Sequence, residues 1–395
     1  MVEKPVILSN FDNIMDEYTE QRVIYDQLTK KVENLIKNLL IAENFPIHSI
    51  TSRTKGIKSL GDKIEKEEKQ YEKLIDITDL SGVRIICFFS EDVDIVAEII
   101  KRNFKVNDEL SVDKREILDP DKFGYVSLHY IIEISEDREN LPEYKQFKGL
   151  TCEIQIRSIL QHAWAEIEHD LGYKSISGIP KDIRRKFSRL AGLLELADEQ
   201  FVFIRHDIEK YGEKIESLIK HSYEGILIDN ITLKSYILIS EDVQNIQFKS
   251  SLIRGIPLAK KIDMGTLEKY NKICKFHNIL TISDLNENIK QNEEKIIDLL
   301  WFLENKTMPS IAQKRSFFSS KHIKELQKTI SSNLQGQKQK RSVSLGFVIW
   351  MLGYVLLCDR KDVEYKRKYL KIMNLDKVTD LENRLIEFCE KNAKK

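Results

Sequence analysis

Apolar residues recur at every third or fourth position near the start of the chain, a spacing that predicts an amphipathic helix over residues 11–40. The pattern then changes to short segments in which extended and helical stretches alternate. The segments predicted there are an extended run at 47–53, a helix at 59–69, a strand at 83–89 and a helix at 93–104.

The alternation continues with strands at 127–134 and 151–157 and a helix at 159–171. Strands and helices of these lengths are typical of one layered domain in which helices pack on a sheet. We therefore predict an α+β domain that has a mixed sheet of about five strands and flanking helices.

Residues 183–218 carry apolar side chains at helical spacing, which predicts a long helix that packs back on this sheet. Gly225 ends the pattern, and a brief strand-like run at 225–239 leads into a helix-rich region that extends to residue 395. We expect three parts: an N-terminal helical arm at 1–46, the α+β domain with its trailing helix at 47–222, and a helix-rich C-terminal domain at 223–395.

Charge and cysteine content narrow the class of protein. The 63 basic residues balance the 63 acidic ones, so no overall field attracts nucleic acid or membranes. The five cysteines lack the spacing of zinc ligands and predict reduced, mostly buried thiols. Because the N-terminus also lacks the pattern of a signal peptide, we expect a cytoplasmic protein.

An uncharged run at residues 343–358 requires a separate interpretation. It is shorter than the roughly 20 apolar residues of a membrane-spanning helix and contains two glycines. The run predicts a buried helix of the C-terminal domain, with a partner-binding helix or membrane insertion as alternatives. We therefore expect no membrane partner.

Two clusters in the α+β domain could bind a triphosphate. The first places Arg53, Lys55 and Lys63 at a strand end and along the following helix, where a fork of donors and two point charges can contact phosphate oxygens. The second is the run DLSGVR, in which Asp79 precedes a strand and can bind magnesium, and Arg84 can stack on a base. Each cluster alone is also compatible with solvated surface or a structural ion pair.

A third cluster lies on the two strands that follow. In the run GYVSLH, Tyr125 can stack on a base, and His129 lies on the same strand face because four residues separate them. In the run EIQIR, the same parity places Glu153, Gln155 and Arg157 on one face. Glu153 is then a carboxylate on an otherwise apolar strand, which can accept a proton, bind a metal or form an ion pair.

The helix at 159–171 carries His162 and His169, which lie about 10.5 Å apart along the axis at 1.5 Å per residue. This separation is too large for one metal ion. We interpret both histidines as packing and hydrogen-bonding groups that position the preceding strand.

Taken together, the runs SRTKGIKSLGDK, DLSGVR, GYVSLH, EIQIR and HAWAEIEHDLGYKS resemble the synthetase domain of the RelA/SpoT family. The resemblance covers about residues 47–220 and implies a nucleotidyltransferase-like fold. It also implies an ATP-dependent nucleotide pyrophosphokinase of the GTP diphosphokinase type. Such an enzyme moves the β,γ-pyrophosphate of ATP to the 3′-hydroxyl of GDP or GTP and makes the alarmones ppGpp and pppGpp.

The same resemblance assigns expected roles to individual residues. It implies that Asp79 and Glu153 are catalytic and bind Mg²⁺, with Glu153 as the base. The residues implied for ATP are Arg53, Lys55, Lys63 and Arg84. Those implied for the acceptor are Lys122, Tyr125, His129, Gln155 and Arg157.

The chain departs from the family pattern beside the stacking tyrosine. Asp121 and Val126 occupy positions where alarmone-producing members typically carry a lysine and an arginine or glutamine, although Lys122 is adjacent. The acceptor is therefore open, and one alternative is a toxin-like enzyme that modifies the 3′-CCA end of tRNA and blocks translation. A local run at 314–341 has eight Lys or Arg against one acid, Glu325, which suits RNA or a solvated helix face.

The resemblance leaves residues 223–395 without a counterpart. One hypothesis is that this part restrains the synthetase, as a built-in antitoxin or a phage sensor. Small members of the family are often oligomeric, so a homo-oligomer is expected. A non-catalytic regulatory module is a further alternative, which would require a degraded site.

Overall fold

The computed structural model describes residues 4–66, 71–113, 127–171, 181–305, 307, 310–319, 322–327, 342–358, 360, 362–372, 384 and 387–390. The contacts divide the chain into two compact units, residues 1–206 and residues 207–395. Each unit has a core of its own.

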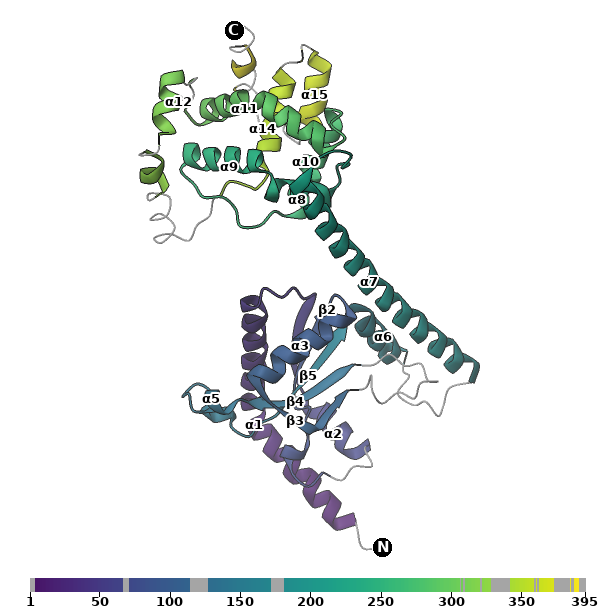
Figure 1. The fold of residues 1–395 in the computed structure, drawn as a ribbon. Coiled ribbons are helices and arrows are strands. Elements are labelled where there is room, and N and C mark those ends of the chain that lie inside the picture. Colours follow the sequence, from purple (N-terminus) through teal and green to yellow (C-terminus); the bar gives the residue numbers. More distant parts are fainter. Residues whose placement is uncertain are drawn as a thin grey trace. The chain divides into compact units, whose positions relative to one another are not determined.

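A five-stranded sheet is the centre of the first unit (Figure 1). Its strand order is β1-β2-β5-β4-β3. The strands are β1 Ser49–Thr54, β2 Ser81–Cys87, β3 Phe104–Asp113, β4 Leu128–Ile134 and β5 Cys152–Ser158. Because β2 and β5 are parallel and the other neighbours are antiparallel, the sheet is mixed, as predicted.

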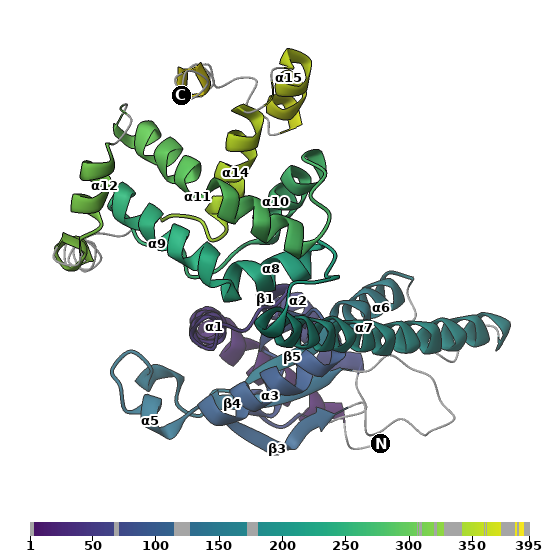
Figure 2. The ribbon, with the colours of Figure 1, turned by 45° about the horizontal axis from the view of Figure 1, so that its top comes forward.

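Helices α1 (Lys4–Ala42) and α3 (Ser90–Asn103) pack against one face of this sheet (Figure 2). Apolar side chains of both helices form a core with the alternate residues of β5, Cys152, Ile154 and Ile156, each of which is buried. Glu153, Gln155 and Arg157 face the opposite side, so the predicted parity of this strand is confirmed. The predicted helical arm is a helix, α1, and contributes to this core.

Shorter helices complete the first unit. They are α2 Ile57–Lys66, the 3₁₀ turns Leu74–Asp76 and Lys145–Phe147, α5 Glu136–Glu139 and α6 Ile159–Asp170. Ser158 caps the start of α6 in a capping box: its side-chain oxygen accepts a hydrogen bond from the amide of Gln161, and Gln161 Oε1 accepts one from the amide of Ser158. This cap fixes the turn from β5 into α6.

The strand β3 was missed by the sequence prediction, which continued the preceding helix to Phe104. The helix ends at Asn103 and the strand begins at Phe104. β3 lies at the sheet edge, and most of its side chains are at least partly exposed. Its sequence therefore shows no clear alternation of apolar and polar residues. An edge strand of this kind carries little hydrophobic period for a sequence pattern to reveal.

The predicted long helix is present as α7, Lys181–His221, and the boundary between the two units falls within it. Its contacts in the first unit include the end of β5 and the start of α3: Asp198 accepts a hydrogen bond from Ser158, and Arg205 pairs with Asp92 at 2.6 Å. The domain boundary expected near residue 222 stays a prediction.

The second unit is helical. Its helices are α8 Asn230–Ile239, α9 Glu241–Arg254, α10 Met264–Phe276, α11 Ile282–Asn305, α12 Ile311–Phe317, α14 Phe347–Cys358 and α15 Val363–Ile372. The strand-like interpretation of 225–239 is wrong, because most of this run is α8. The Asp229 side chain caps α8 by accepting hydrogen bonds from the amides of Ile231 and Thr232. Apolar side chains on several sides of α8 are buried in the core of the second unit.

Most of the apolar run at 343–358 forms α14, Phe347–Cys358, and most side chains of this helix are buried in the core of the second unit. The prediction of a buried helix is confirmed. Within the described ranges, no helix is both long and apolar enough to cross a membrane.

The prediction that all five cysteines are reduced is wrong for two of them, because Cys358 and Cys389 form a disulfide. Cys87, Cys152 and Cys274 are free and buried. The partner of Cys358 lies 31 residues away in sequence, so spacing alone could not identify the pair.

Candidate functional site

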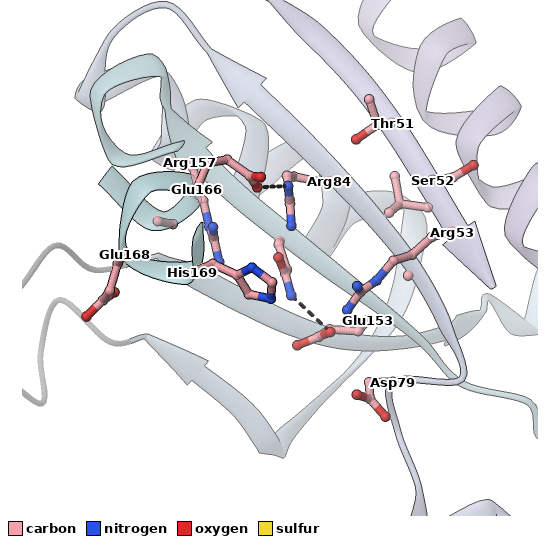
Figure 3. Close-up of a pocket in the computed structure, with 14 residues that line it drawn as sticks. Thr51, Ser52, Arg53, Asp79, Arg84, Glu153, Arg157, Glu166, Glu168 and His169 are labelled. Carbon is pink, nitrogen blue, oxygen red and sulfur yellow. Dashed lines mark hydrogen bonds and ion pairs between the residues drawn. The ribbon is translucent and has the colours of Figure 1, made fainter. Parts of the chain in front are cut away.

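A pocket of about 670 Å³ opens on the sheet face opposite α1 and α3 (Figure 3). Strands β1, β2 and β5 form its floor, and α6 contributes one wall. The lining residues are Thr51, Ser52, Arg53, Asp79, Gly82, Val83, Arg84, Glu153, Gln155, Arg157, Ala165, Glu166, Glu168 and His169. The lining therefore combines several cations with several carboxylates.

The strand register explains how these side chains come together. Gly82 lies between Arg53 on β1 and Glu153 on β5, so the residue between the arginine and the carboxylate has no side chain. Two residues along, Arg84 is paired with Gln155, and Gln155 is paired with His129 on β4. Residues that are distant in sequence thus form two neighbouring rows across the sheet.

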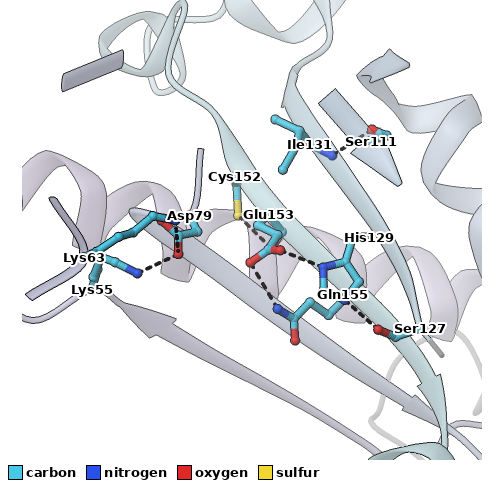
Figure 4. A network of polar contacts seen from close by, with 10 residues as sticks. All are labelled: Lys55, Lys63, Asp79, Ser111, Ser127, His129, Ile131, Cys152, Glu153 and Gln155. Atoms are coloured by element: carbon cyan, nitrogen blue, oxygen red, sulfur yellow. Dashed lines mark hydrogen bonds and ion pairs between the residues drawn. The ribbon is translucent and has the colours of Figure 1, made fainter. Parts of the chain in front are cut away.

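Asp79 lies just before β2 and is held by two lysines (Figure 4). Its Oδ2 accepts a hydrogen bond from Lys55 Nζ at 2.6 Å and lies 3.3 Å from Lys63 Nζ. Burial opposes ionisation, but the hydrogen bond and charge of Lys55 and the charge of Lys63 outweigh it, so the pKa of Asp79 is lowered. The carboxylate is therefore ionised at neutral pH.

Glu153 is held from two sides near the start of β5 (Figure 4). Its Oε1 lies 2.8 Å from His129 Nδ1, and its Oε2 accepts a hydrogen bond from Gln155 at 3.1 Å. Burial raises the pKa of Glu153, but His129 and Gln155 lower it by more, and the net pKa is below the usual range. His129 Nε2 in turn lies 2.6 Å from Ser127 Oγ.

The other end of the pocket is cationic. Arg84 donates a hydrogen bond to Glu166 Oε1 on α6 at 2.6 Å, so the helix wall orients this guanidinium (Figure 3). The Nε of Arg157 is buried and has no hydrogen-bond partner among the described residues. Desolvation and the nearby charge of Arg84 lower the pKa of Arg157. A bound polyanion would stabilise two guanidinium groups that lie this close together.

The two carboxylates fit a divalent cation. Asp79 Oδ1 is buried and has no hydrogen-bond partner in the described part of the chain. The charge of Asp79 also raises the pKa of Glu153, so the two groups interact electrostatically. The described residues contain no cluster of three or more His, Cys, Asp or Glu that could hold a metal alone. One or two carboxylates with substrate phosphates are the usual ligands of Mg²⁺.

The structure brings most of the predicted site residues together. Six of them line the pocket: Arg53, Asp79, Arg84, Glu153, Gln155 and Arg157. Lys55, Lys63 and His129 contact the lining carboxylates. Lys122 and Tyr125 lie outside the described residues, as do Asp121 and Val126.

The wall formed by α6 was not predicted from the sequence. Glu166, Glu168 and His169 line the pocket, so the interpretation of His169 as a packing group is not supported. The spacing of Ala165, Glu166 and His169 at three and four residues is the signal that could have identified this helix face. Thr51, Ser52 and Val83 were also missed, and nothing in their residue types marks them.

Known proteins are similar to the region of this chain that carries the pocket residues. Residues 52–177 match the family model described as "Region found in RelA / SpoT proteins". GTP pyrophosphokinase YwaC of Bacillus subtilis is 29% identical over 218 residues, which cover 51% of this chain and 97% of that protein. GTP pyrophosphokinase YjbM of the same organism is 29% identical over 169 residues, covering 42% of this chain and 76% of the relative.

Among solved structures, small alarmone synthetase 1 from Bacillus subtilis is 26% identical, with a TM-score of 0.42. The match covers 49% of this chain and 99% of that one. The family match at residues 52–177 lies within the first unit.

Proposed function

Because residues 52–177 belong to the RelA/SpoT family, we propose that this chain is an ATP-dependent pyrophosphokinase that makes ppGpp and pppGpp from GDP and GTP. The observation that carries the proposal is one pocket in which Asp79 and Glu153 face a set of cations. The names of the relatives support pyrophosphate transfer as the reaction.

The cationic side of the pocket suits the donor. Lys55 and Lys63 contact Asp79, and the phosphates of ATP would replace the aspartate as partner of these lysines. Arg84 is oriented by Glu166 and presents its planar group to an adenine base. The transferring group is then held by fixed charges rather than by water.

Glu153 suits the role of base toward the acceptor. It accepts the proton of the 3′-hydroxyl while that oxygen forms a bond to the β-phosphorus of ATP. The bond between the β-phosphorus and the oxygen bridging to the α-phosphorus breaks, and AMP leaves. His129 and Gln155 hold the Glu153 carboxylate in place throughout.

A magnesium ion bound at Asp79 and Glu153 would neutralise charge on the transferring pyrophosphate. The unpartnered Oδ1 of Asp79 is the atom that supports this assignment. In the free enzyme, Lys55 and Lys63 pair with the Asp79 carboxylate, so this buried charge is not left without a partner.

The proposal is tested with Asp79→Asn and Glu153→Gln, which keep size and remove charge. We expect pyrophosphate transfer from labelled ATP to GDP or GTP to fall by about 100-fold or more in each. Circular dichroism should show unchanged folding. Glu133→Gln is the matched control, because Glu133 is a β4 carboxylate that pairs with Lys105 outside the pocket. Full activity of both site variants would exclude the assignment.

A tRNA 3′ end is the second candidate acceptor. It is favoured by Asp121 and Val126 beside the stacking tyrosine and by the basic run at 314–341, of which only part is described. Incubation with ATP labelled in the γ-phosphate, GTP and tRNA together distinguishes the two. Label in a small nucleotide supports alarmone synthesis, and label in tRNA supports the toxin-like reaction.

A regulatory role of residues 223–395 is a hypothesis within this proposal. Expression of the chain with and without these residues tests it. Stronger growth inhibition by the shortened chain supports restraint of the synthetase, and weaker inhibition supports delivery of substrate.

A further inference from the structure

A small third core lies between α1, α2 and the first 3₁₀ turn, separate from the core of the sheet. Its buried residues are Ile14, Tyr18, Tyr25, Leu60, Leu74, Ile77 and Leu80. Three residues of the site adjoin this core in the chain. Lys55 comes just before α2, Lys63 lies on α2, and Asp79 is next to Leu80. The packing of the small core therefore sets where these three charged groups lie.

Tyr18 on α1 makes the polar contact between this core and the site. Its side chain is fully buried, and its hydroxyl donates a hydrogen bond of 2.5 Å to the backbone carbonyl of Lys55. The amide of Lys55 donates to the carbonyl of Leu80 at 2.9 Å. Both backbone groups of Lys55 are thus held, and its side chain extends to Asp79 Oδ2 at 2.6 Å (Figure 4).

The hydrogen bond from Tyr18 falls at the turn between strand and helix. β1 ends at Thr54 and α2 begins at Ile57, so Lys55 lies outside both the strand ladder and the helix. A backbone carbonyl outside regular structure is satisfied by a side chain or by water. Tyr18 is this partner for Lys55, and it fixes the direction in which the lysine leaves the strand.

Other side chains of α1 hold β1 along its length. Ser52 donates a hydrogen bond to Glu33 Oε2 at 2.6 Å. Thr54 Oγ1 donates toward Thr29 Oγ1 at 3.2 Å and Asp26 Oδ1 at 3.3 Å. The hydrogen bond at the turn continues this row one residue beyond the strand. Helix α1, which the sequence analysis placed outside the synthetase domain, therefore fixes the strand that carries the cations.

We propose that Tyr18 is a positioning residue for the triphosphate of ATP and acts through Lys55. The inference rests on the proposed function, because it takes Lys55 as a ligand of the ATP phosphates. Tyr18 is not among the described residues that line the pocket. Its hydroxyl fixes the backbone from which Lys55 extends, so the ammonium group is held where the phosphates bind. Without the hydroxyl the turn is less restrained, and the entropy lost on ordering Lys55 weakens binding.

Binding of adenine nucleotides to the full chain tests this role. The probe is an ATP analogue with a methylene group between the α- and β-phosphorus, which prevents transfer. Tyr18→Phe removes only the hydroxyl, and we expect the Kd of the analogue to rise about fivefold in isothermal titration calorimetry, the equivalent of one net hydrogen bond. The Kd of AMP should be unchanged, because AMP lacks the β- and γ-phosphates. A general structural defect would weaken both ligands.

Tyr25→Phe is the matched control for this substitution. Tyr25 is buried in the same core, and its ring centroid lies 5.8 Å from that of Tyr18. The control variant loses a hydroxyl from the same core but keeps the hydrogen bond to the Lys55 carbonyl. We expect it to bind both the ATP analogue and AMP as tightly as the wild type.

A double-mutant cycle tests whether Tyr18 acts through Lys55. In a chain that carries Lys55→Met, Tyr18→Phe should cause no further loss of affinity for the analogue. An equal loss in both backgrounds would overturn the proposal, and so would a Tyr18→Phe chain that binds the analogue as tightly as the wild type. Those outcomes leave the proposed function intact. A wild-type chain that does not bind the analogue would instead reject the ATP site, and this inference with it.

Discussion

The carboxylate of Glu153 shows how the site is built at the scale of single residues. His129 reaches it from the neighbouring strand, Gln155 reaches it from its own strand, and Ser127 contacts the far side of the histidine ring. With Nδ1 donating to the carboxylate, a neutral His129 must accept at Nε2, which the Ser127 hydroxyl can satisfy as donor. Ser127 is therefore expected to position the base without touching substrate.

Ser127→Ala tests this positioning role. A hydrogen bond contributes about 1 kcal/mol net, which corresponds to roughly a fivefold fall in kcat. KM for ATP should be unchanged, and Ser127→Thr should restore the rate because it keeps the hydroxyl. Ser135→Ala is the control, since Ser135 accepts a hydrogen bond from Arg138 beyond the end of β4. A change in KM with kcat intact would contradict the role.

Asp79 links the site to the pH dependence of stability. Its pKa in the folded chain is lowered, because Lys55 and Lys63 outweigh the effect of burial. A lowered pKa means that the ionised group stabilises the fold above the unfolded pKa of about 3.9 and that this contribution is lost as pH falls below it. We therefore expect Asp79→Asn to reduce the free energy of unfolding by about 1–3 kcal/mol at pH 7.

Urea unfolding at neutral and acidic pH measures this effect. The difference between wild type and Asp79→Asn should shrink as pH falls below about 4. Asp137→Asn, at an exposed position on α5, should not change stability at either pH. A difference of equal size at both pH values would show that the loss does not come from the charge.

Packing of α14 governs the second unit at the scale of elements. A Cβ at Gly353 would collide with Tyr369 Oη and would lie 2.8 Å from Ile273 Cγ2, so the helix approaches α10 and α15 closely only because this residue is glycine. Gly346 is constrained in the same way, since it has a φ of 77° and a Cβ there would lie 2.6 Å from Ile237 and Tyr270.

Gly353→Ala should reduce the free energy of unfolding of the second unit by about 1–3 kcal/mol, because the methyl group overpacks the core. Gly212→Ala in α7 is the matched control, because a Cβ at that position would lie 3.8 Å from its nearest neighbour, Ile231 Cγ2, which is an ordinary contact. It should raise stability by up to about 1 kcal/mol through helix propensity. Equal effects of the two substitutions in denaturant unfolding would contradict this account of the α14 contact.

Two separate cores define the molecule as a whole. The core around the sheet draws on α1, α3 and the strands, and the core of the second unit draws on α8, α9, α10, α11, α14, α15 and the end of α7. The disulfide Cys358–Cys389 closes a 31-residue separation within the second unit. Ligand binding and disulfide reduction should therefore act on different cores.

Thermal unfolding of the full chain should show two transitions. A non-hydrolysable ATP analogue at about 100 times its Kd should stabilise one of them by about 2.7 kcal/mol, because it binds the pocket of the first unit. A reductant should destabilise the other by about 3–4 kcal/mol in the chain-entropy model. Cys274→Ser keeps the disulfide and serves as control for thiol loss in that core. A single transition moved by both agents would contradict independent cores.

The local pattern of apolar and polar residues determined many of the helices and the strand faces of this protein. The period of two placed Glu153, Gln155 and Arg157 on one strand face, and the helical period predicted α1, α3, α6 and α7, because burial of one face imposes these repeats on the chain. The ordered motifs, with their residue types, indicated the chemistry of the family and most of the pocket.

Only the tertiary structure decided which residues meet. The strand order placed Arg53, Gly82 and Glu153 in one row, and the turn after Ser158 brought Glu166 and His169 of α6 to the pocket wall. The sequence period predicted α7 as a helix, but it did not show which apolar side chains of that helix are exposed. Sequence period records that a side chain is apolar, whereas the partner it contacts depends on register and topology between distant segments.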